Sequence, residues 1–222
     1  KIIIFVVILF FLGCSDTNSI VSIETIVKHD LVDIQELDST LLVELKYSTI
    51  DNFMKTDVYG NLKTCYMRRI PAQMLVKAHE ILKTEHPELR LLIYDGLRPR
   101  SIQWTLWNTL SDVPEKERTN FVADPRTGSI HNFGAAVDLT VTEKNGRPLD
   151  MGTHYDYFGD LAFPRLEDSL VVVGDLKQEQ VNNRLILRHA MTEAGFSPIT
   201  TEWWHFDSFP YKETKTKFTI IE

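Results

Sequence analysis

Two short clusters of potential metal ligands, far apart in a chain of 222 residues, limit most strongly what this protein can fold into. The first is Ser-Ile-His-Asn-Phe-Gly-Ala-Ala-Val-Asp over residues 129–138, and the second is Glu-Trp-Trp-His over residues 202–205. A catalytic zinc site uses three His or Asp/Glu ligands and keeps one position open for water. The two clusters offer three such ligands, His131, Asp138 and His205. They also leave Glu202 over, a carboxylate that can take a proton from that water.

The second cluster carries a geometric condition. On a regular strand, residues three apart point to opposite faces, so Glu202 and His205 can share one site only where the strand ends, twists or bulges. In the first cluster, the small residues 134–136 would let the backbone pass close to an ion. The helical zinc signature HExxH is absent, because Lys83 stands where a second histidine should follow His79. We therefore expect His79 on a helix surface.

Composition points to one soluble domain with its own core. Hydrophobic residues make up 43% of the chain and charged residues 25%, near the average for globular proteins. The formal net charge is −7 and no Lys/Arg-rich stretch offsets it, which argues against a nucleic-acid partner. Apart from Cys14 the only cysteine is Cys65, which we expect to be a small buried hydrophobe without a disulfide.

The first residues resemble an export signal. The apolar run over residues 2–12 is too short for a transmembrane helix, which needs about 20 residues, and suits a signal peptide. Phe11-Leu12-Gly13-Cys14 resembles a bacterial lipobox, in which the cysteine receives lipid. We expect a lipoprotein signal peptide over 1–13, a tether over 14–30 and a single domain over 31–222. An ordinary signal peptide with a coincidental cysteine is the alternative.

Hydrophobic periodicity predicts an α+β fold, with helices packed against a central antiparallel sheet and the zinc site at the sheet. The expected helices begin at Ile70-Pro71 and end at His86-Pro87, span Ser101 to Leu110 with Trp104 and Trp107 on one face, and span Gln178 to Ala194 before Gly195. The expected strands are Val32 to Tyr47, Leu91 to Tyr94, Val137 to Thr142 and Phe196 to Phe206. Asn145-Gly146 is typical of a hairpin turn.

The two clusters resemble the S-x-H-x-x-G-x-A-x-D and E-x-W-H motifs of the D-alanyl-D-alanine dipeptidases, the VanX-like branch of the zinc D-Ala-D-Ala peptidases. Three further segments are similar to that branch. Residues 47–53 resemble its Tyr-x-Thr-x-x-Asn-Phe stretch. Residues 95–99 resemble its D-x-Y-R-P loop, with Leu97 in place of Tyr, and residues 150–156 resemble its M-G-x-x-F-D segment, with Tyr155 in place of Phe. The resemblance runs from about Val32 to Phe209.

The resemblance implies a role for each matching residue. His131, Asp138 and His205 would bind one Zn²⁺, and Glu202 would be the catalytic base. Arg98 would hold the oxyanion of the tetrahedral intermediate, unless it is only a surface ion pair with Asp95. The substrate would be the dipeptide D-Ala-D-Ala, and three residues would bind it: Asp156 at its ammonium, with Ser129 and Tyr59 as helpers. Tyr47 could be structural, and His154 receives no role.

Two other functions remain open at this point. A D,D-carboxypeptidase that trims peptidoglycan stem peptides would share the metal motifs but needs an open cleft. A non-catalytic zinc-binding module for cell-wall peptides would need neither Glu202 nor Arg98. In each case we expect an exported bacterial protein, held at the membrane by a lipid on Cys14.

Overall fold

The two most continuous apolar and β-branched runs of the sequence form the centre of the sheet. The computed structural model describes residues 20–222. In it β4 (Leu89–Asp95) and β5 (Ala136–Glu143) pair antiparallel, as predicted for these runs. The complete sheet has the order β2-β4-β5-β7-β6, with β2 (Leu42–Val43), β6 (Ser197–Pro198) and β7 (His205–Asp207). Only the edge pair β2–β4 is parallel among these neighbours, so the α+β prediction with a largely antiparallel sheet is confirmed.

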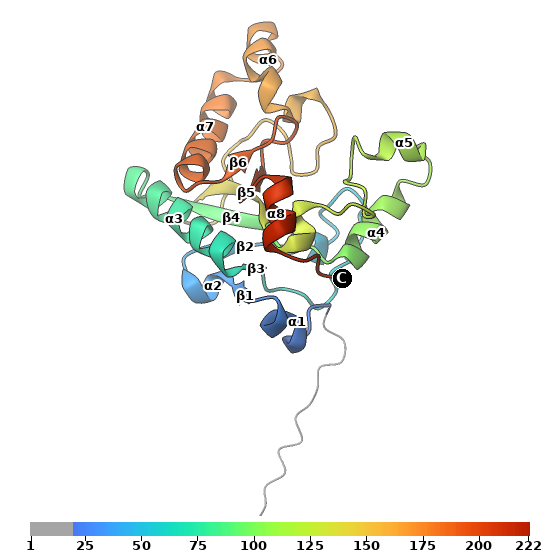
Figure 1. Ribbon diagram of the computed structural model, residues 1–222. Coiled ribbons are helices and arrows are strands. Elements are labelled where there is room, and N and C mark those ends of the chain that lie inside the picture. Colours follow the sequence, from blue (N-terminus) through green and yellow to red (C-terminus); the bar gives the residue numbers. More distant parts are fainter. Residues whose placement is uncertain (1–19) are drawn as a thin grey trace, which may run out of the picture.

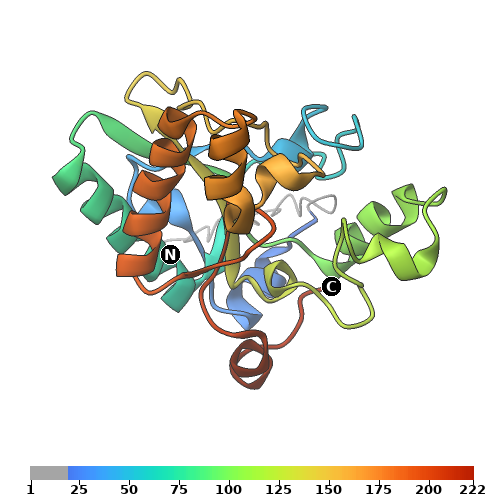
Figure 2. The same ribbon diagram turned by 90° about the horizontal axis from the view of Figure 1, so that it is seen from above.

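Helices surround this sheet (Figure 1). Helices α3 and α7 pack against each other and against β4 and β5, and α4 and α5 lie on the opposite side of the molecule (Figures 1 and 2). The α-helices are α1 (Ile23–Lys28), α2 (Ile34–Leu37), α3 (Arg69–Glu85), α4 (Arg100–Thr109), α5 (Glu115–Arg118), α6 (Glu167–Val173), α7 (Gln178–Glu193) and α8 (Tyr211–Lys217). The 3₁₀ turns are η1 (Lys46–Ser48), η2 (Ile130–Phe133), η3 (Asp160–Ala162) and η4 (Pro164–Leu166). A separate antiparallel ladder joins β1 (Leu31–Asp33) to β3 (Tyr66–Arg68).

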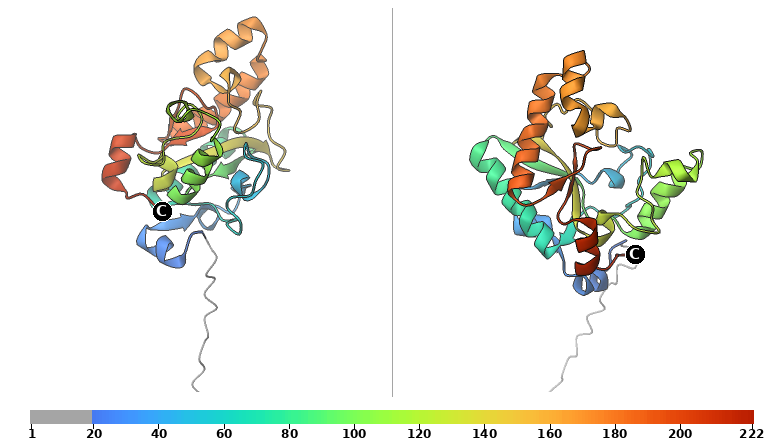
Figure 3. Two further views of the ribbon diagram at one scale, coloured as in Figure 1. Left: turned by 90° about the vertical axis from the view of Figure 1, so that its right-hand side faces the viewer. Right: turned by 45° about the horizontal axis from the view of Figure 1, so that its top comes forward.

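The two faces of β5 have different tasks. Side chains alternate along a strand, so Val137, Leu139 and Val141 share the face on which α7 packs, and all three are buried. Asp138 and Thr140 share the opposite face, where each lines a cavity. Figure 3 shows the sheet between the α3–α7 layer and the α4–α5 side. One strand therefore supplies the core on one face and the site on the other.

A β-bulge places a second acidic residue on the site face. In the β4–β5 pair the register shifts between Ile93 and Asp95, so that Asp95 lies opposite Asp138. In an unbroken ladder the partner of Asp138 would be Tyr94. Bulges of this kind redirect a side chain next to an active site. The bulge therefore brings two carboxylates to one end of the sheet.

Three helix predictions are confirmed at their ends. Helix α3 ends at Glu85, before His86-Pro87, and α4 covers the predicted segment to within one residue. Helix α7 stops before Gly195, which has a φ of +102° that favours glycine. Trp104 and Trp107 do not share an environment as expected: Trp107 is buried, and Trp104 is exposed. The turn at Asn145-Gly146 is confirmed, and Cys65 is a free buried thiol.

Two strand predictions are wrong, and so is the prediction that His79 lies on a helix surface. Residues 32–47 form β1, α2, β2 and η1 rather than one strand, because Asp33 caps α2 with its side chain. Residues 196–206 form β6, a loop and the start of β7. His79 is completely buried on α3, where its Nδ1 lies 3.0 Å from Asp38 Oδ2. A charged partner directly after α2 therefore holds this polar side chain in the interior.

The folded region begins earlier than the boundary at residue 31. Ser22 caps α1 through its side chain, Val21 and His29 are buried, and the Arg68 guanidinium donates to the His29 carbonyl. Residues 20–30 thus belong to the domain, and the predicted tether over 14–30 is too long. The predicted signal peptide and Cys14 lie outside the described residues. Within residues 20–222, no helix has the length and apolar character that crossing a membrane requires.

Candidate metal centre and its pocket

Three separate elements carry the predicted ligands to one point. His131 lies on η2, Asp138 on β5 and His205 at the first position of β7. β7 pairs with β5 so that His205 lies directly opposite Asp138. The turn η2 is fixed by a capping box, in which Ser129 accepts from the His131 N–H and the Asn132 side chain accepts from the Ser129 N–H.

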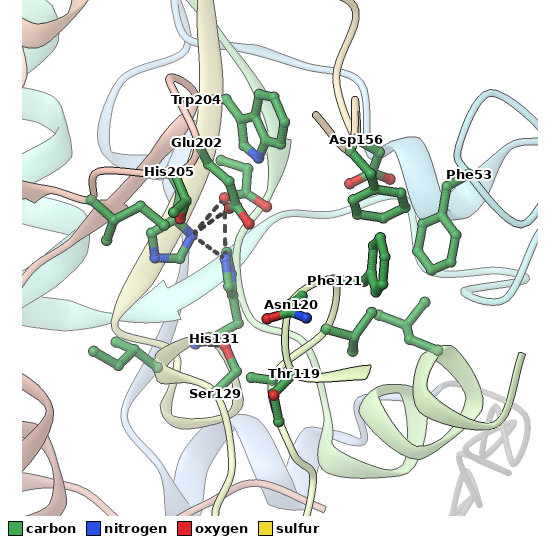
Figure 4. A pocket seen from close by; sticks show the side chains of 18 of the residues that line it. Phe53, Thr119, Asn120, Phe121, Ser129, His131, Asp156, Glu202, Trp204 and His205 are labelled. Atoms are coloured by element: carbon green, nitrogen blue, oxygen red, sulfur yellow. Dashed lines mark hydrogen bonds and ion pairs between the residues drawn. The ribbon is translucent and has the colours of Figure 1, made fainter. Parts of the chain in front are cut away.

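The three ligand atoms form a small triangle (Figure 4). His131 Nε2 lies 3.1 Å from His205 Nδ1 and 3.2 Å from Asp138 Oδ1, and His205 Nδ1 lies 2.9 Å from the same oxygen. Ligands of a tetrahedral zinc ion, each about 2.0–2.1 Å from the metal, lie about 3.3 Å from one another. The spacing therefore fits a single small cation bound between them.

Hydrogen bonds on the outer side of each ring fix which nitrogen faces the centre. His131 Nδ1 donates to the Gly96 carbonyl at 2.7 Å, and His205 Nε2 donates to Asp207 Oδ1 at 2.9 Å. The two inward nitrogens of the neutral rings are then acceptors, and they face an acceptor oxygen of Asp138. Three acceptors around one point need a cation, so the donor set fits a metal ion.

The pKa shifts of His205 and Asp138 agree with a cation bound between the three ligands. Burial alone lowers the pKa of His205, but the carboxylates of Asp207 and Asp138 outweigh it and raise that pKa well above its usual value. Burial alone raises the pKa of Asp138, yet His131 and His205 lower it overall. The surroundings of the triangle therefore favour a positive charge at its centre.

Glu202 satisfies the geometric condition set by its spacing from His205. It lies in the loop before β7, so the strand alternation does not apply to it, and its Oε2 is 4.0 Å from His205 Nδ1. It lies outside the triangle of ligands but lines the same pocket. Burial raises the pKa of Glu202, and Asp138 adds to this effect. The side chain is therefore a carboxylate beside the metal centre with a raised affinity for a proton.

Arg98 lies beside the ligands and is held on several sides. Its guanidinium bonds Asp95 Oδ2 at 2.7 and 2.8 Å, and donates to Gln103 Oε1 at 3.1 Å. It also lies 3.5 Å from Asp138 Oδ2. The pair with Asp95 exists, but it is buried rather than on the surface, and Arg98 lines the pocket. The guanidinium is thus a fixed cation at the edge of the metal centre.

Asp156 lines the same pocket away from the ligands, as the labelled side chains of Figure 4 show. It has a φ of +58°, a strained conformation for a residue other than glycine. The Tyr47 hydroxyl donates to both of its oxygens at 3.2 and 3.3 Å. Burial, helped by Asp138 and Glu202, raises the pKa of Asp156 to about 8. The carboxylates of Asp138 and Glu202 thus act on this part of the pocket as well.

Ser129 and Tyr59, which were expected to help bind the substrate, differ in their position relative to the pocket. Ser129 caps η2 and lines the pocket, so its position agrees with the prediction. Tyr59 is completely buried and is not among the residues that line the pocket; its hydroxyl donates to Asp95 Oδ1 at 2.7 Å. The structure therefore does not bring Tyr59 to the pocket in which substrate was expected to bind, because this hydrogen bond holds its hydroxyl against Asp95. The expected contact of residues 134–136 with an ion also differs: a Cβ at Gly134 would meet the Arg68 backbone.

Sequence reasoning missed two residues that orient the ligands. The Tyr155 hydroxyl donates to Asp138 Oδ2 at 2.9 Å, and Asp207 accepts from His205. Tyr155 stood out only as a departure from the family segment. Asp207 follows His205 by two positions, so on a strand both lie on the same face, and that spacing could have identified it.

Three converging ligands, a carboxylate outside the ligand set and a fixed guanidinium share one cavity of about 740 Å³. These are the features of a metal-dependent hydrolase. The sequence profile of the D-Ala-D-Ala dipeptidase family, Peptidase_M15, matches residues 27–220, and the chain belongs to this family. It is therefore a peptidase, as the resemblance implied.

Individual relatives are similar over most of the chain. The D-alanyl-D-alanine dipeptidase of Escherichia coli K12 is 33% identical over 80% of this chain and 84% of its own length. The proteins of the same name from Enterococcus faecium and Streptomyces coelicolor are each 29% identical, over 73% and 86% of this chain and 83% and 98% of their own lengths. Among solved structures, the LD-carboxypeptidase LdcB is similar with a TM-score of 0.41 and 20% identity, over 68% of this chain and 63% of that chain.

Proposed function

We propose that this protein is a zinc peptidase that hydrolyses free D-alanyl-D-alanine to two D-alanines, as part of cell-wall metabolism. The observation that carries the proposal is the arrangement inside one cavity: Glu202 and Arg98 flank the ligand triangle, and Asp156 faces the same space. The names of the relatives support the substrate.

His131, Asp138 and His205 would hold the ion. When bound, Zn²⁺ would polarise the scissile carbonyl and make water more acidic. Glu202 accepts the proton of the attacking water and then delivers it to the leaving amine, a task that its raised pKa favours. Arg98 donates hydrogen bonds to the developing oxyanion, and Asp95 and Gln103 keep the guanidinium in place while it does so.

Asp156 would select the substrate through its ammonium group. A buried carboxylate whose pKa is raised gains most from a cation, and Tyr47 orients it by donating to both oxygens. A stem peptide brings an amide to this position instead of an ammonium. The proposal therefore favours a dipeptidase over the D,D-carboxypeptidase alternative.

The direct test incubates the protein with Zn²⁺ and D-Ala-D-Ala and measures the release of free D-Ala. We expect release by the wild type and a loss of about 10³-fold or more in Glu202→Gln, with zinc content unchanged. The control is Glu80→Gln, an exposed glutamate on α3, which should cleave like the wild type. No release by the wild type, or full release by Glu202→Gln, would overturn the proposal.

We also propose that the protein is exported and held to a bacterial membrane by lipid on Cys14. The short apolar run before that cysteine and the lipobox-like segment support this. Expression of the full precursor with a radiolabelled fatty acid tests it. Label should enter the wild type and be absent from Cys14→Ser, and equal labelling of both would refute the anchor.

A further inference from the structure

Three phenylalanines meet at the Asp156 end of the larger cavity. Phe158 contacts Phe53 with ring centroids 5.1 Å apart and Phe121 with centroids 5.2 Å apart, both edge to face. All three line the cavity, and each comes from a different loop. Figure 4 shows Phe53 and Phe121 on the same side of the pocket as Asp156, away from His131 and His205. We name Phe53, Phe121 and Phe158 the aromatic wall.

One member of the aromatic wall, Phe53, also borders a second space. Phe53 and Asp156 line a second cavity of about 540 Å³ as well as the first one. The second cavity includes Lys46, Thr140 and Trp203 but none of the three ligands. Phe53 therefore lies with Asp156 at the boundary of the two cavities, and Phe158 packs on Phe53 from the first cavity.

We propose that the aromatic wall is the element that restricts substrates to a free amino end. This inference rests on the proposed function, in which Asp156 binds the substrate ammonium. Asp156 supplies the attraction for a charged amine, and the wall supplies the steric exclusion of any acyl group on it. Specificity of this kind needs a repulsive element against the wrong substrate as well as an attractive one for the right substrate.

The positions of the rings make the wall separable from catalysis. Phe158 is 40% exposed, so its removal opens the wall from the solvent side without leaving a buried cavity. Phe53 is half-buried between the two cavities, so its removal joins them. Neither residue bonds a ligand, Glu202 or Arg98. Loss of either ring should therefore change which peptides enter more than how fast a bound peptide reacts.

The test compares D-Ala-D-Ala with N-acetyl-D-Ala-D-Ala in the zinc-loaded wild type, Phe158→Ala and Phe53→Ala. Hydrolysis of the second peptide gives N-acetyl-D-alanine and D-alanine, and kcat/KM is measured for both. We expect the ratio of the acetylated to the free peptide to be low in the wild type and to rise by about tenfold or more in each variant. The matched control is Phe163→Ala, which removes another ring from the cavity lining but not from the wall, and should leave the ratio unchanged.

The outcomes separate the two proposals. If the wild type cleaves neither peptide, the proposed function fails and the wall inference falls with it. If the wild type cleaves the free dipeptide but the ratio stays constant in both wall variants, only the wall inference is overturned. The same holds if Phe163→Ala raises the ratio equally, or if the wild type already cleaves the acetylated peptide as well as the free one.

Discussion

At the scale of single residues, the two oxygens of Asp138 have different partners. Oδ1 faces His131 and His205, and Oδ2 accepts from the Tyr155 hydroxyl, with the Arg98 guanidinium 3.5 Å away. Hydrogen bonds to the outer atom of a ligand fix its orientation and typically account for about 10–100-fold in metal affinity. Tyr155 is therefore a positioning residue for the metal centre.

We expect Tyr155→Phe to weaken zinc binding by about tenfold, because the ring still packs while Asp138 loses one donor. Competition with a chromophoric chelator measures the affinity without any activity assay. Tyr66→Phe serves as the control, because this half-buried tyrosine on β3 does not line the pocket. Unchanged zinc affinity in Tyr155→Phe would contradict the role.

Tyr59 is connected to the pocket only through Asp95 and Arg98. Its hydroxyl donates to Asp95, which in turn holds Arg98. We expect Tyr59→Phe to lower kcat several-fold with little change in KM or zinc affinity, because Asp95 keeps its bond from the Gly96 N–H but holds the guanidinium less firmly. Steady-state kinetics with D-Ala-D-Ala distinguish this from a substrate contact, which would raise KM.

At the scale of elements, the turn η2 depends on one glycine. Gly134 ends η2 with a φ of +69°, and a Cβ there would lie 3.3 Å from the Arg68 backbone nitrogen. Arg68 also donates through its side chain to the Phe133 carbonyl. The residue that ends η2 therefore packs closely against β3, next to the turn that carries His131.

We expect Gly134→Ala to reduce the free energy of unfolding by about 1–2 kcal/mol and to weaken zinc binding as well. Gly174→Ala is the control, since Gly174 has a similar φ of +85° but open space around its Cα and ends the remote helix α6. Denaturant titration and chelator competition of both variants measure the difference. Equal effects on zinc affinity would mean that crowding at Arg68 is irrelevant.

The loop before β7 is another element-scale feature. Trp203 and Trp204 are both buried, and Trp203 Nε1 donates to Thr153 Oγ1 at 2.7 Å. Trp204 packs edge to face on Tyr155. Burial of two consecutive aromatic side chains is incompatible with a regular strand that has one exposed face. The two tryptophans therefore anchor the loop between β6 and β7 that carries Glu202.

At the scale of the whole molecule, the burial of His79 beside Asp38 makes stability depend on pH. Burial lowers the pKa of His79 to about 4, although Asp38 opposes this, from an ordinary value of 6.5. The unfolded chain thus binds a proton at higher pH than the folded one. Stability from this group is complete above about pH 6.5, falls as the pH decreases, and is lost below about pH 4.

We expect this loss to amount to about 3 kcal/mol in the wild type, at about 1.4 kcal/mol per pKa unit. In His79→Leu the stability should change less between pH 6.5 and 4, because no proton is taken up at this position. Asp38 still has Lys83 and Thr40 as donors, so the variant should fold. Urea titrations at several pH values measure the slope, and equal slopes would rule out His79 as the cause.

Much of the site was predictable because its chemistry depends on residue types at short spacings. His131, Asp138 and His205 were identified from their clusters, and the structure brings all three together. The central strands and the long helices were also predictable, since their apolar periodicity is local. Tyr59, His79 and the strand breaks were not, because each is decided by a partner distant in the chain: Asp95, Asp38 and the packing around Trp203.

The sequence by itself indicated the candidate ligands, the candidate base and the α+β composition of this protein, because those properties belong to residue types and local patterns. Only the tertiary structure decided how they work together. The bulge that turns Asp95 toward Asp138, the hydroxyl of Tyr155 behind that ligand and the aromatic wall beside Asp156 all depend on contacts between distant segments. Such contacts form when the hydrophobic core closes, and no local pattern encodes them.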